Sequence, residues 1–379
     1  MKKSLIALAV LAASGAAMAQ SSVTLYGLVD ADVGRFKTNV AVGKTIQNMS
    51  QSRVESDGLN GSRWGMRMRE DLGGGMAAVA NLESGFKTDT GTSAQGGLLF
   101  GRRANVGLVS GFGTVTLGRN SSSYTDVASD HAMMGGASIF DPSNTNNGNS
   151  ATVAVSALGG NVADAAKFLG RNTSWIGFSE RIDNSVKYVS PNFNGFSVGV
   201  LYGFGENKTA SNDASKTVSA SLKYANGPLL VSGGYQSEGS LLTATGAKPV
   251  LENAILSVAY DFGVAKVGAG FNRAKYKDIT VGSVTRDIAA QNEWNLSVAV
   301  PLGATTLSAG YAQSKGDDLG KSSGFGIQAL YSLSKRTTLY AGGVSTKAYD
   351  KAVAAFLAAS PTSSIGRTTT YAAGIRHTF

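Results

Sequence analysis

The stretch Arg63-Trp64-Gly65-Met66-Arg67-Met68-Arg69 decides the fold. Its three arginines share one set of alternate positions, and its tryptophan and two methionines share the other. This period of two is typical of a β-strand with one polar and one apolar face. Because an arginine facing lipid costs about 2 to 4 kcal/mol at the bilayer midplane, the arginine face must meet water. The wet face is either the interior of a membrane barrel or the outside of a soluble sandwich.

Both ends of the chain show the same alternation. In residues 23–33 one face is apolar or small and the other carries Tyr26, Asp30 and Asp32. At the other end Tyr371, Ala373, Ile375, His377 and Phe379 alternate, so the chain ends on an aromatic residue. Phe379 is therefore predicted to be the assembly signal that the barrel-assembly machinery recognises.

The spacing of turns distinguishes a barrel from a sandwich. Short turns rich in glycine, asparagine, aspartate and serine alternate with longer polar segments, which is typical of an up-and-down barrel in the outer membrane. Seven short and eight longer connections predict sixteen antiparallel strands. The short turns are near residues 71–75, 110–113, 190–195, 226–228, 261–263, 301–303 and 334–336, and the longer segments are near residues 37–60, 88–97, 121–180, 206–215, 239–251, 275–290, 315–321 and 347–368.

The first nineteen residues are predicted to be a signal peptide. Lys2 and Lys3 precede a short apolar run, and Ala17-Met18-Ala19 forms an A-x-A cleavage site. No later stretch approaches the roughly 20 apolar residues that a membrane-spanning helix needs. The chain is therefore divided into a signal peptide, residues 1–19, and a barrel domain, residues 20–379.

Composition excludes several classes of protein. The chain has no cysteine, so no disulfide stabilises it. Its formal charge is +9, from 34 basic and 25 acidic residues, and loss of Lys2 and Lys3 leaves 32 against 25, or +7. Export makes nucleic acid an unsuitable partner for this charge, and the bases are spread along strands without forming a tail or patch, so they are interpreted as lining a surface or cavity of the fold.

Several motifs, in order, resemble the general trimeric porins of β-proteobacteria. The resemblance covers nearly the whole chain after residue 19 and implies a homotrimer of sixteen-stranded barrels, multi-pass in the outer membrane of a Gram-negative bacterium. In each barrel the third external loop is expected to fold into the lumen. The motifs are Ser22-Val23-Thr24-Leu25-Tyr26-Gly27, Glu70-Asp71-Leu72-Gly73, Leu82-Glu83-Ser84-Gly85-Phe86, residues 113–119, 184–191 and 331–337, and the ending Gly374 to Phe379.

The resemblance also implies the position of the pore constriction. Arg63, Arg102 and Arg181 fall where such porins carry a basic cluster on the barrel wall, and Glu83 matches a wall carboxylate. The third loop should supply facing acids, and it offers Asp126 and Asp130, with Asp141 further on. That loop, residues 121–180, is long, and Val153 to Leu169 is predicted to include a short helix.

Further positions follow from the alternation. Arg67, Arg69 and Lys187 are expected to line the lumen. Arg119 shares a face with Val115 and Leu117, so it is placed at a subunit interface. Around residues 102–108 the alternation is irregular: Arg102, Ala104, Val106 and Leu108 are predicted inward, and Arg103 and Asn105 outward. Weak anion selectivity is expected because inward bases (Arg63, Arg67, Arg69, Arg102, Arg181, Lys187, Lys223, Lys266) outnumber inward acids (Asp30, Asp32, Glu83, Asp183).

A general diffusion porin is the predicted function, passing ions and small hydrophilic solutes without a cofactor, a metal or a catalytic group. An enzyme is disfavoured, because neither histidine, His131 or His377, belongs to a recognisable nucleophile motif. A substrate-specific channel or an adhesin-like barrel has the same architecture, and saturable flux would indicate the former. Outer-membrane lipid and lipopolysaccharide are the expected surroundings.

Overall fold

The structure is a computed structural model that describes residues 21–42, 45–143, 174–210, 214–239, 250–281, 284–347, 349–351 and 365–379. The predicted signal peptide, its cleavage site and the helix predicted between Val153 and Leu169 lie outside these residues. Within the part of the chain that the structure describes, no helix is both long and apolar enough to cross a membrane.

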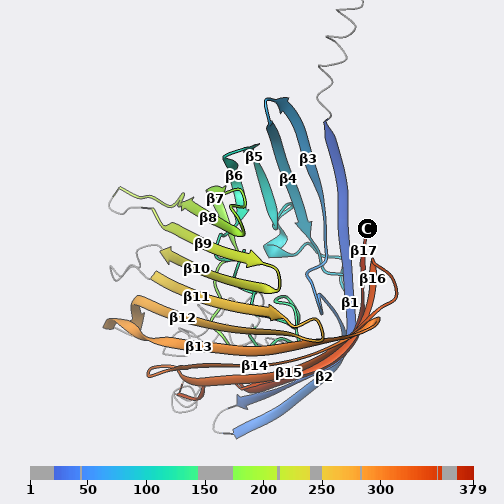
Figure 1. Cartoon of the computed structure of the whole chain (residues 1–379). Coiled ribbons are helices and arrows are strands. Elements are labelled where there is room, and N and C mark those ends of the chain that lie inside the picture. The colour runs from blue at the N-terminus through green and yellow to red at the C-terminus, as the bar shows by residue number, and fades with distance from the viewer. Residues whose placement is uncertain are drawn as a thin grey trace, which may run out of the picture.

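In the described residues seventeen β-strands make up one antiparallel sheet, and a short 3-10 helix, η1 (Gln95–Gly97), follows the fourth strand. Figure 1 shows the strands following one another in chain order around a curved wall. The strands are β1 (Ser22–Val42), β2 (Thr45–Ser56), β3 (Arg63–Gly73), β4 (Met76–Gly85), β5 (Arg103–Ser110), β6 (Gly113–Ser121), β7 (Arg181–Val189), β8 (Phe196–Phe204), β9 (Lys216–Asn226), β10 (Leu229–Gly239), β11 (Val250–Asp261), β12 (Lys266–Val281), β13 (Val284–Leu302), β14 (Thr305–Gly316), β15 (Gly320–Ser332), β16 (Thr337–Lys347) and β17 (Ile365–Thr378).

The sheet closes on itself as a barrel of sixteen strand positions, as predicted. β1 pairs with β17, and the terminal Phe379 exchanges two backbone hydrogen bonds with Gly27. Seventeen strands fill sixteen positions because β2 and β3 together occupy one of them. β3 pairs with the first part of β1, and β2 pairs with the second part of β1. Residues 57–62 connect these two halves as a non-strand insert. Closure leaves no unpaired strand edge in the lipid, where an unpaired backbone group would cost several kcal/mol.

The alternation within strands matches the prediction at both ends of the chain. Val23, Leu25 and Val33 are more than half exposed on the outer face of β1, whereas Asp30 and Asp32 are buried on its inner face. In β17 the side chains of Tyr371 and Ile375 are exposed outward in the same way. An apolar outer face and a polar inner face are what a barrel in lipid requires.

Three segments predicted as loops contain strand. Most of 37–60 belongs to the β1–β2 ladder, which runs from Ala31 opposite Ser56 to Val42 opposite Thr45. Likewise β12 and β13 pair as far as Val281 and Val284, and β14 and β15 as far as Gly316 and Gly320. These ladders lie at the ends of the strands, where their sequences are polar. A strand with water on both sides has no apolar face, so its alternation signal disappears.

The predicted orientation of residues 102–108 is wrong after its first residue. Val106 and Leu108 are about half exposed on the outer face, and Arg103 and Asn105 line the lumen. Arg102 also lies on the lumen side, because it precedes β5 and is not bound by its alternation. The side chains of the neighbouring residues Arg102 and Arg103 therefore both lie on the lumen side of the wall.

Asp183 is a second correction: it was predicted inward and instead forms an ion pair with Arg119, its own side chain 71% exposed. The β6–β7 ladder shifts register between Gly118 and Asn120, so the alternation that holds at Lys187 does not continue through this bulge to Asp183. Arg119 lies opposite Ala104, on the outward side of the β5–β6 ladder.

The third loop begins after β6 and lies against the inner wall, as expected. Tyr124 donates from its hydroxyl to Asn272 on β12 (3.0 Å), the backbone N–H of Met133 donates to Ser297 on β13 (2.9 Å), and Ser138 donates to Gln328 on β15 (2.6 Å). The loop thus crosses the lumen side of the wall from β12 to β15. Its far part contacts the 57–62 insert, where the N–H of Ile139 donates to the carbonyl of Gly58 (2.9 Å).

Glycines on the inner wall make room for this loop. A Cβ at Gly326 on β15 would lie 1.8 Å from the carbonyl oxygen of Phe140, and one at Gly270 on β12 would lie 2.5 Å from the His131 ring. Only glycine allows such a close backbone approach. Some strand glycines therefore mark the path of the third loop.

Candidate functional site

The predicted basic cluster is assembled around one carboxylate, Glu83 on β4. Arg102 donates from Nε to its Oε1 (2.7 Å), Tyr26 donates from its hydroxyl to its Oε2 (2.8 Å), and Arg63 lies 3.7 Å from Oε2. Glu83 is buried, with three donor groups directed at its two oxygens. The backbone makes space for this cluster, because Gly61 and Gly85 lie against the Arg102 side chain.

Arg181, at the start of β7, pairs with its neighbour Glu180 (2.8 Å). Burial raises the pKa of the Glu180 carboxyl, and the positive charges of Arg181 and Arg102 oppose that shift. Arg102 thus acts on both Glu83 and Glu180. The structure therefore brings the three predicted wall arginines together, with two carboxylates among them. Glu180 was not predicted, although its position directly before Arg181 was a usable signal.

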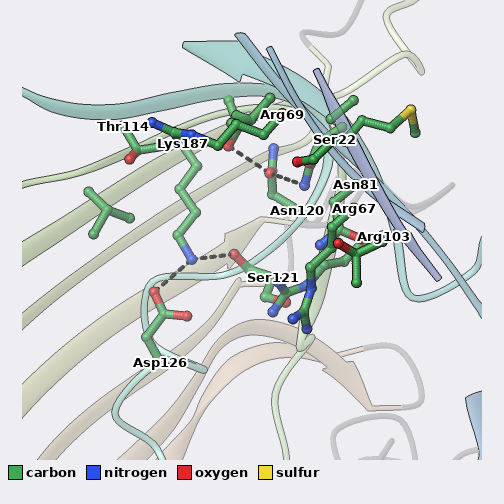
Figure 2. Close-up of a pocket in the computed structure, with 17 residues that line it drawn as sticks. Ser22, Arg67, Arg69, Asn81, Arg103, Thr114, Asn120, Ser121, Asp126 and Lys187 are labelled. Atoms are coloured by element: carbon green, nitrogen blue, oxygen red, sulfur yellow. Dashed lines mark hydrogen bonds and ion pairs between the residues drawn. The ribbon is translucent and has the colours of Figure 1, made fainter. Parts of the chain in front are cut away.

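A second group of bases lines a cavity of about 640 Å³ on the lumen wall. Arg67 and Arg69 come from β3, Arg103 from β5 and Lys187 from β7, and Asp126 is the only acid among the lining residues. Figure 2 shows the Lys187 side chain extended toward Asp126 in the third loop. Ser22, Thr24, Thr114 and Val189 also line this cavity and place it toward the end of the barrel that carries the short turns.

The arginines of this cavity are not neutralised. Among the residues that the structure describes, Arg67, Arg69 and Arg103 form no ion pair with an acid. Arg67 instead stacks over the Tyr26 ring, 4.0 Å from its centroid, a cation–π contact that leaves the charge in place. Three uncompensated positive charges therefore face the water of the lumen. Arg103 was missed because the alternation was extended one residue too far toward the N-terminus.

The predicted third-loop acids are held by lysines of the adjoining wall. Asp126 accepts from Lys187 on β7 (2.6 Å), and Asp130 accepts from Lys223 on β9 (3.0 Å). Each lysine has a second bond to the chain, from Lys187 to the carbonyl of Ser121 (3.0 Å) and from Lys223 to the carbonyl of Asp126 (3.3 Å). These four residues form a lysine seat that fixes the start of the loop.

Two further titratable groups, His131 and Asp141, belong to the third loop and are buried. His131 stacks on Trp175, with ring centroids 5.0 Å apart, and its two ring nitrogens lie 3.2 Å from Ser257 Oγ and 3.4 Å from Ser143 Oγ. Burial lowers the pKa of His131 to about 4 and raises that of Asp141 to about 6. Among the described residues no three His, Cys, Asp or Glu side chains are grouped so as to hold a metal ion.

Comparison with known proteins agrees with this architecture. A family model described as Gram-negative porin matches residues 5–351. Among curated relatives, outer membrane porin protein 32 of Delftia acidovorans is 35% identical over 90% of this chain and 88% of its own length. An outer membrane porin protein of Bordetella pertussis is 31% identical over the whole of both chains.

A solved structure, the anion-selective porin from Comamonas acidovorans, superposes with a TM-score of 0.71. It is 26% identical in sequence, and the match covers 95% of this chain and 100% of that one. A closed barrel, a loop across its lumen and a wall of arginines are thus found in a chain with porin relatives along its length. This chain belongs to the Gram-negative porin family of the outer membrane.

Proposed function

We propose that the protein is a general diffusion porin whose lumen passes ions and small hydrophilic solutes and weakly prefers anions. Barrels of about sixteen strands leave an aqueous channel, so passage needs no catalytic group. The observation that carries the preference is the set of unpaired arginines, Arg67, Arg69 and Arg103, beside a loop whose Asp126 and Asp130 are already paired. Fixed positive charge in a narrow wet passage raises the local concentration of anions.

The roles of individual residues belong to the same proposal. Arg63, Arg102 and Arg181 are the basic wall of the constriction, and Glu83 holds the first two in place. Arg67, Arg69 and Lys187 line the lumen, and Phe379 is the assembly signal. The similarity of the Comamonas acidovorans structure, whose title describes an anion-selective porin, supports the sign of the preference. No enzymatic activity is proposed.

We also propose a homotrimer in which the mature chain begins after residue 19. The outward ion pair between Arg119 and Asp183 supports a subunit contact on this wall. It lies beside the exposed apolar side chains of Val106 and Leu117, where two charges are better placed against protein than against lipid. The barrel-assembly machinery and outer-membrane lipid are the other proposed partners.

Single-channel recording of the refolded protein in a planar bilayer tests the function. We expect conductance steps in groups of three, proportional to salt concentration, and a reversal potential under a KCl gradient that indicates anion preference. Neutralising Arg63, Arg102 or Arg181 should reduce that preference. Saturable block by one solute would replace general diffusion with a substrate-specific channel, and the absence of any conductance would favour an adhesin-like barrel.

A further inference from the structure

Two aspartates on the inner face of β1, Asp30 and Asp32, form a buried aspartate pair, at 0% and 3% exposed. The non-strand insert between β2 and β3 lies against both, and β16 and β17 continue the wall beside them (Figure 1). Asp30 accepts the N–H groups of Leu59 and Asn60 (2.9 and 2.8 Å). It also accepts the hydroxyl of Tyr340. Asp32 differs, because both of its carboxylate oxygens are buried with no hydrogen-bond partner among the described residues.

Neither carboxylate of the aspartate pair has a base as its partner. Among the described residues, Asp30 and Asp32 form no ion pair. Arg376 lies opposite Asp30 in the β1–β17 ladder, but its terminal nitrogens donate to Asn60 (2.7 Å) and Thr338 (3.3 Å). Because burial of an unpaired charge is costly, buried carboxylates in proteins are paired or coordinate a metal ion. The aspartate pair therefore lacks a cationic partner.

The two other acids near Asp32, Glu55 and Asp57, each have a base of their own. Glu55 lies opposite Asp32 in the β1–β2 ladder and forms an ion pair with Arg53. Asp57 forms an ion pair with Lys87 (2.7 Å). The uncompensated negative charge is thus confined to the aspartate pair.

A glycine keeps the space beside these oxygens open. A Cβ at Gly58 would lie 2.7 Å from Asp32 Oδ2 and 2.3 Å from the hydroxyl oxygen of Tyr340. That hydroxyl is bound to Asp30 Oδ1, so oxygens of both aspartates border the same small space. Carboxylate oxygens are the donors that Ca²⁺ prefers, and backbone carbonyls and water complete its about six to eight ligands.

We propose that the aspartate pair binds one Ca²⁺ ion between the barrel wall and the insert. Asp32 supplies both carboxylate oxygens, Asp30 supplies the remaining lone pair of Oδ1, and water supplies further ligands. Two carboxylates match the charge of a divalent cation. The site is distinct from a cluster of three or more His, Cys, Asp or Glu ligands, which the described residues lack. Mg²⁺ fits less well, because it demands near-ideal octahedral geometry.

The ion lies where the insert meets the constriction. The carbonyl of Gly58 accepts from the N–H of Ile139 in the third loop (2.9 Å), and Gly61 lies against the Arg102 side chain. Ca²⁺ bound to the aspartate pair therefore stabilises the contact between the insert, the third loop and the basic cluster. This role goes beyond the passage of solutes, which needs no bound ion.

Equilibrium dialysis of the protein against radioactive calcium counts the bound ions. Protein refolded in detergent from inclusion bodies carries no lipopolysaccharide, whose phosphates bind Ca²⁺ themselves. We expect one ion per chain, with the affinity of extracellular calcium sites, about 10⁻⁴ to 10⁻³ M. Asp32→Asn removes one of two charged ligands and should weaken binding about tenfold or more. The matched control Asp71→Asn removes the same charge from an exposed short turn and should bind as the native protein does.

Unfolding in urea gives a second readout. At this affinity, about 10 mM Ca²⁺ should raise the folded-to-unfolded ratio about 10- to 100-fold in the native protein and in Asp71→Asn, but hardly in Asp32→Asn. Gly58→Ala fills the space beside Asp32 without changing charge and should also weaken binding. A native-like circular dichroism spectrum shows that each variant is folded.

Two results would overturn the proposal. If the native protein binds no Ca²⁺, the buried Asp32 carboxyl is neutral and needs no cation. If Asp32→Asn binds Ca²⁺ as tightly as the native protein, the ion lies elsewhere. Either result leaves the proposed diffusion channel untouched, because channel function is measured separately by conductance.

Discussion

The arginine wall of the cavity, which consists of Arg67 and Arg69 on β3 and Arg103 on β5, and the lysine seat on β7 and β9 both present bases to the lumen. Only the arginine wall leaves its positive charge without an acidic partner. In the seat, Lys187 and Lys223 each meet a carboxylate of the third loop at hydrogen-bonding distance. On the wall, Arg67, Arg69 and Arg103 have no acidic partner among the described residues. The lysine seat therefore positions the third loop, and the arginine wall provides the positive electrostatic field in the lumen.

The largest expected effect is a loss of stability on breaking the ion-pair cluster around Glu83. Arg102→Ala leaves the buried Glu83 carboxylate with Tyr26 and a more distant Arg63, and removing one partner of a buried pair costs about 3 kcal/mol or more. We expect the free energy of unfolding, measured in urea, to fall by that amount. Arg336→Ala, an exposed turn residue, is the control and should change it little.

A loss of stability similar to that of the control would mean that Glu83 is satisfied without Arg102. The companion variant Arg102→Ala/Glu83→Gln should recover part of the loss, because it removes the buried charge that was left without its partner.

Acid should weaken the docking of the third loop through His131. Burial lowers the pKa of His131 from 6.5 to about 4, so between these values the unfolded chain binds a proton that the folded chain does not. The stability that His131 contributes is complete above pH 6.5 and is lost as the pH falls toward 4, by about 3 kcal/mol. Unfolding of the native protein and of His131→Gln, followed from pH 7 to 4, measures this difference.

The neighbouring Asp141 titrates with the opposite sign. Burial raises its pKa to about 6, so its contribution is present below its unfolded value and is lost as the pH rises through 6. The comparison of native and His131→Gln protein separates the two groups, because Asp141 is present in both. Parallel pH profiles for the two proteins would show that His131 does not titrate with the loop.

A smaller change tests the path of the third loop. Gly326→Ala places a methyl group where the backbone of Phe140 now lies, and overpacking of this kind costs about 1 to 3 kcal/mol. We expect the loop to be displaced into the lumen and single-channel conductance to fall. Gly111→Ala provides a control at a short turn, where a Cβ meets nothing within 4 Å and φ is not positive. Identical conductance in native and Gly326→Ala channels would place the loop elsewhere.

The sequence was sufficient to predict the barrel, its strand number and most of its inward residues, because lipid on one side and water on the other impose a period of two. It failed where that contrast disappears. Residues 37–60 were predicted as a loop because their strands extend into water, and Asp183 was placed inward because a bulge is invisible to alternation.

The site was predicted less completely than the fold. Position along a strand indicated that Arg63, Arg67 and Arg69 face the lumen, but not which acids compensate them. The pairing of Asp126 and Asp130 with wall lysines depends on contacts between residues more than 60 positions apart. Arg103 and Glu180 were not predicted because Arg103 is the first residue of β5 and Glu180 directly precedes β7, and at the start of a strand alternation carries least information.

Reversal potential under a KCl gradient tests most directly whether the unpaired arginines set the anion preference. Arg67→Gln/Arg103→Gln removes two free charges from the cavity wall, whereas Asp126→Asn/Lys187→Gln removes a neutral pair from the same cavity. We expect the first variant to lose roughly half of the preference for chloride over potassium and the second to keep nearly all of it. If the two variants lose the same share of the chloride preference, the paired residues of the lysine seat matter as much as the unpaired arginines. That result would contradict the role assigned to the arginine wall.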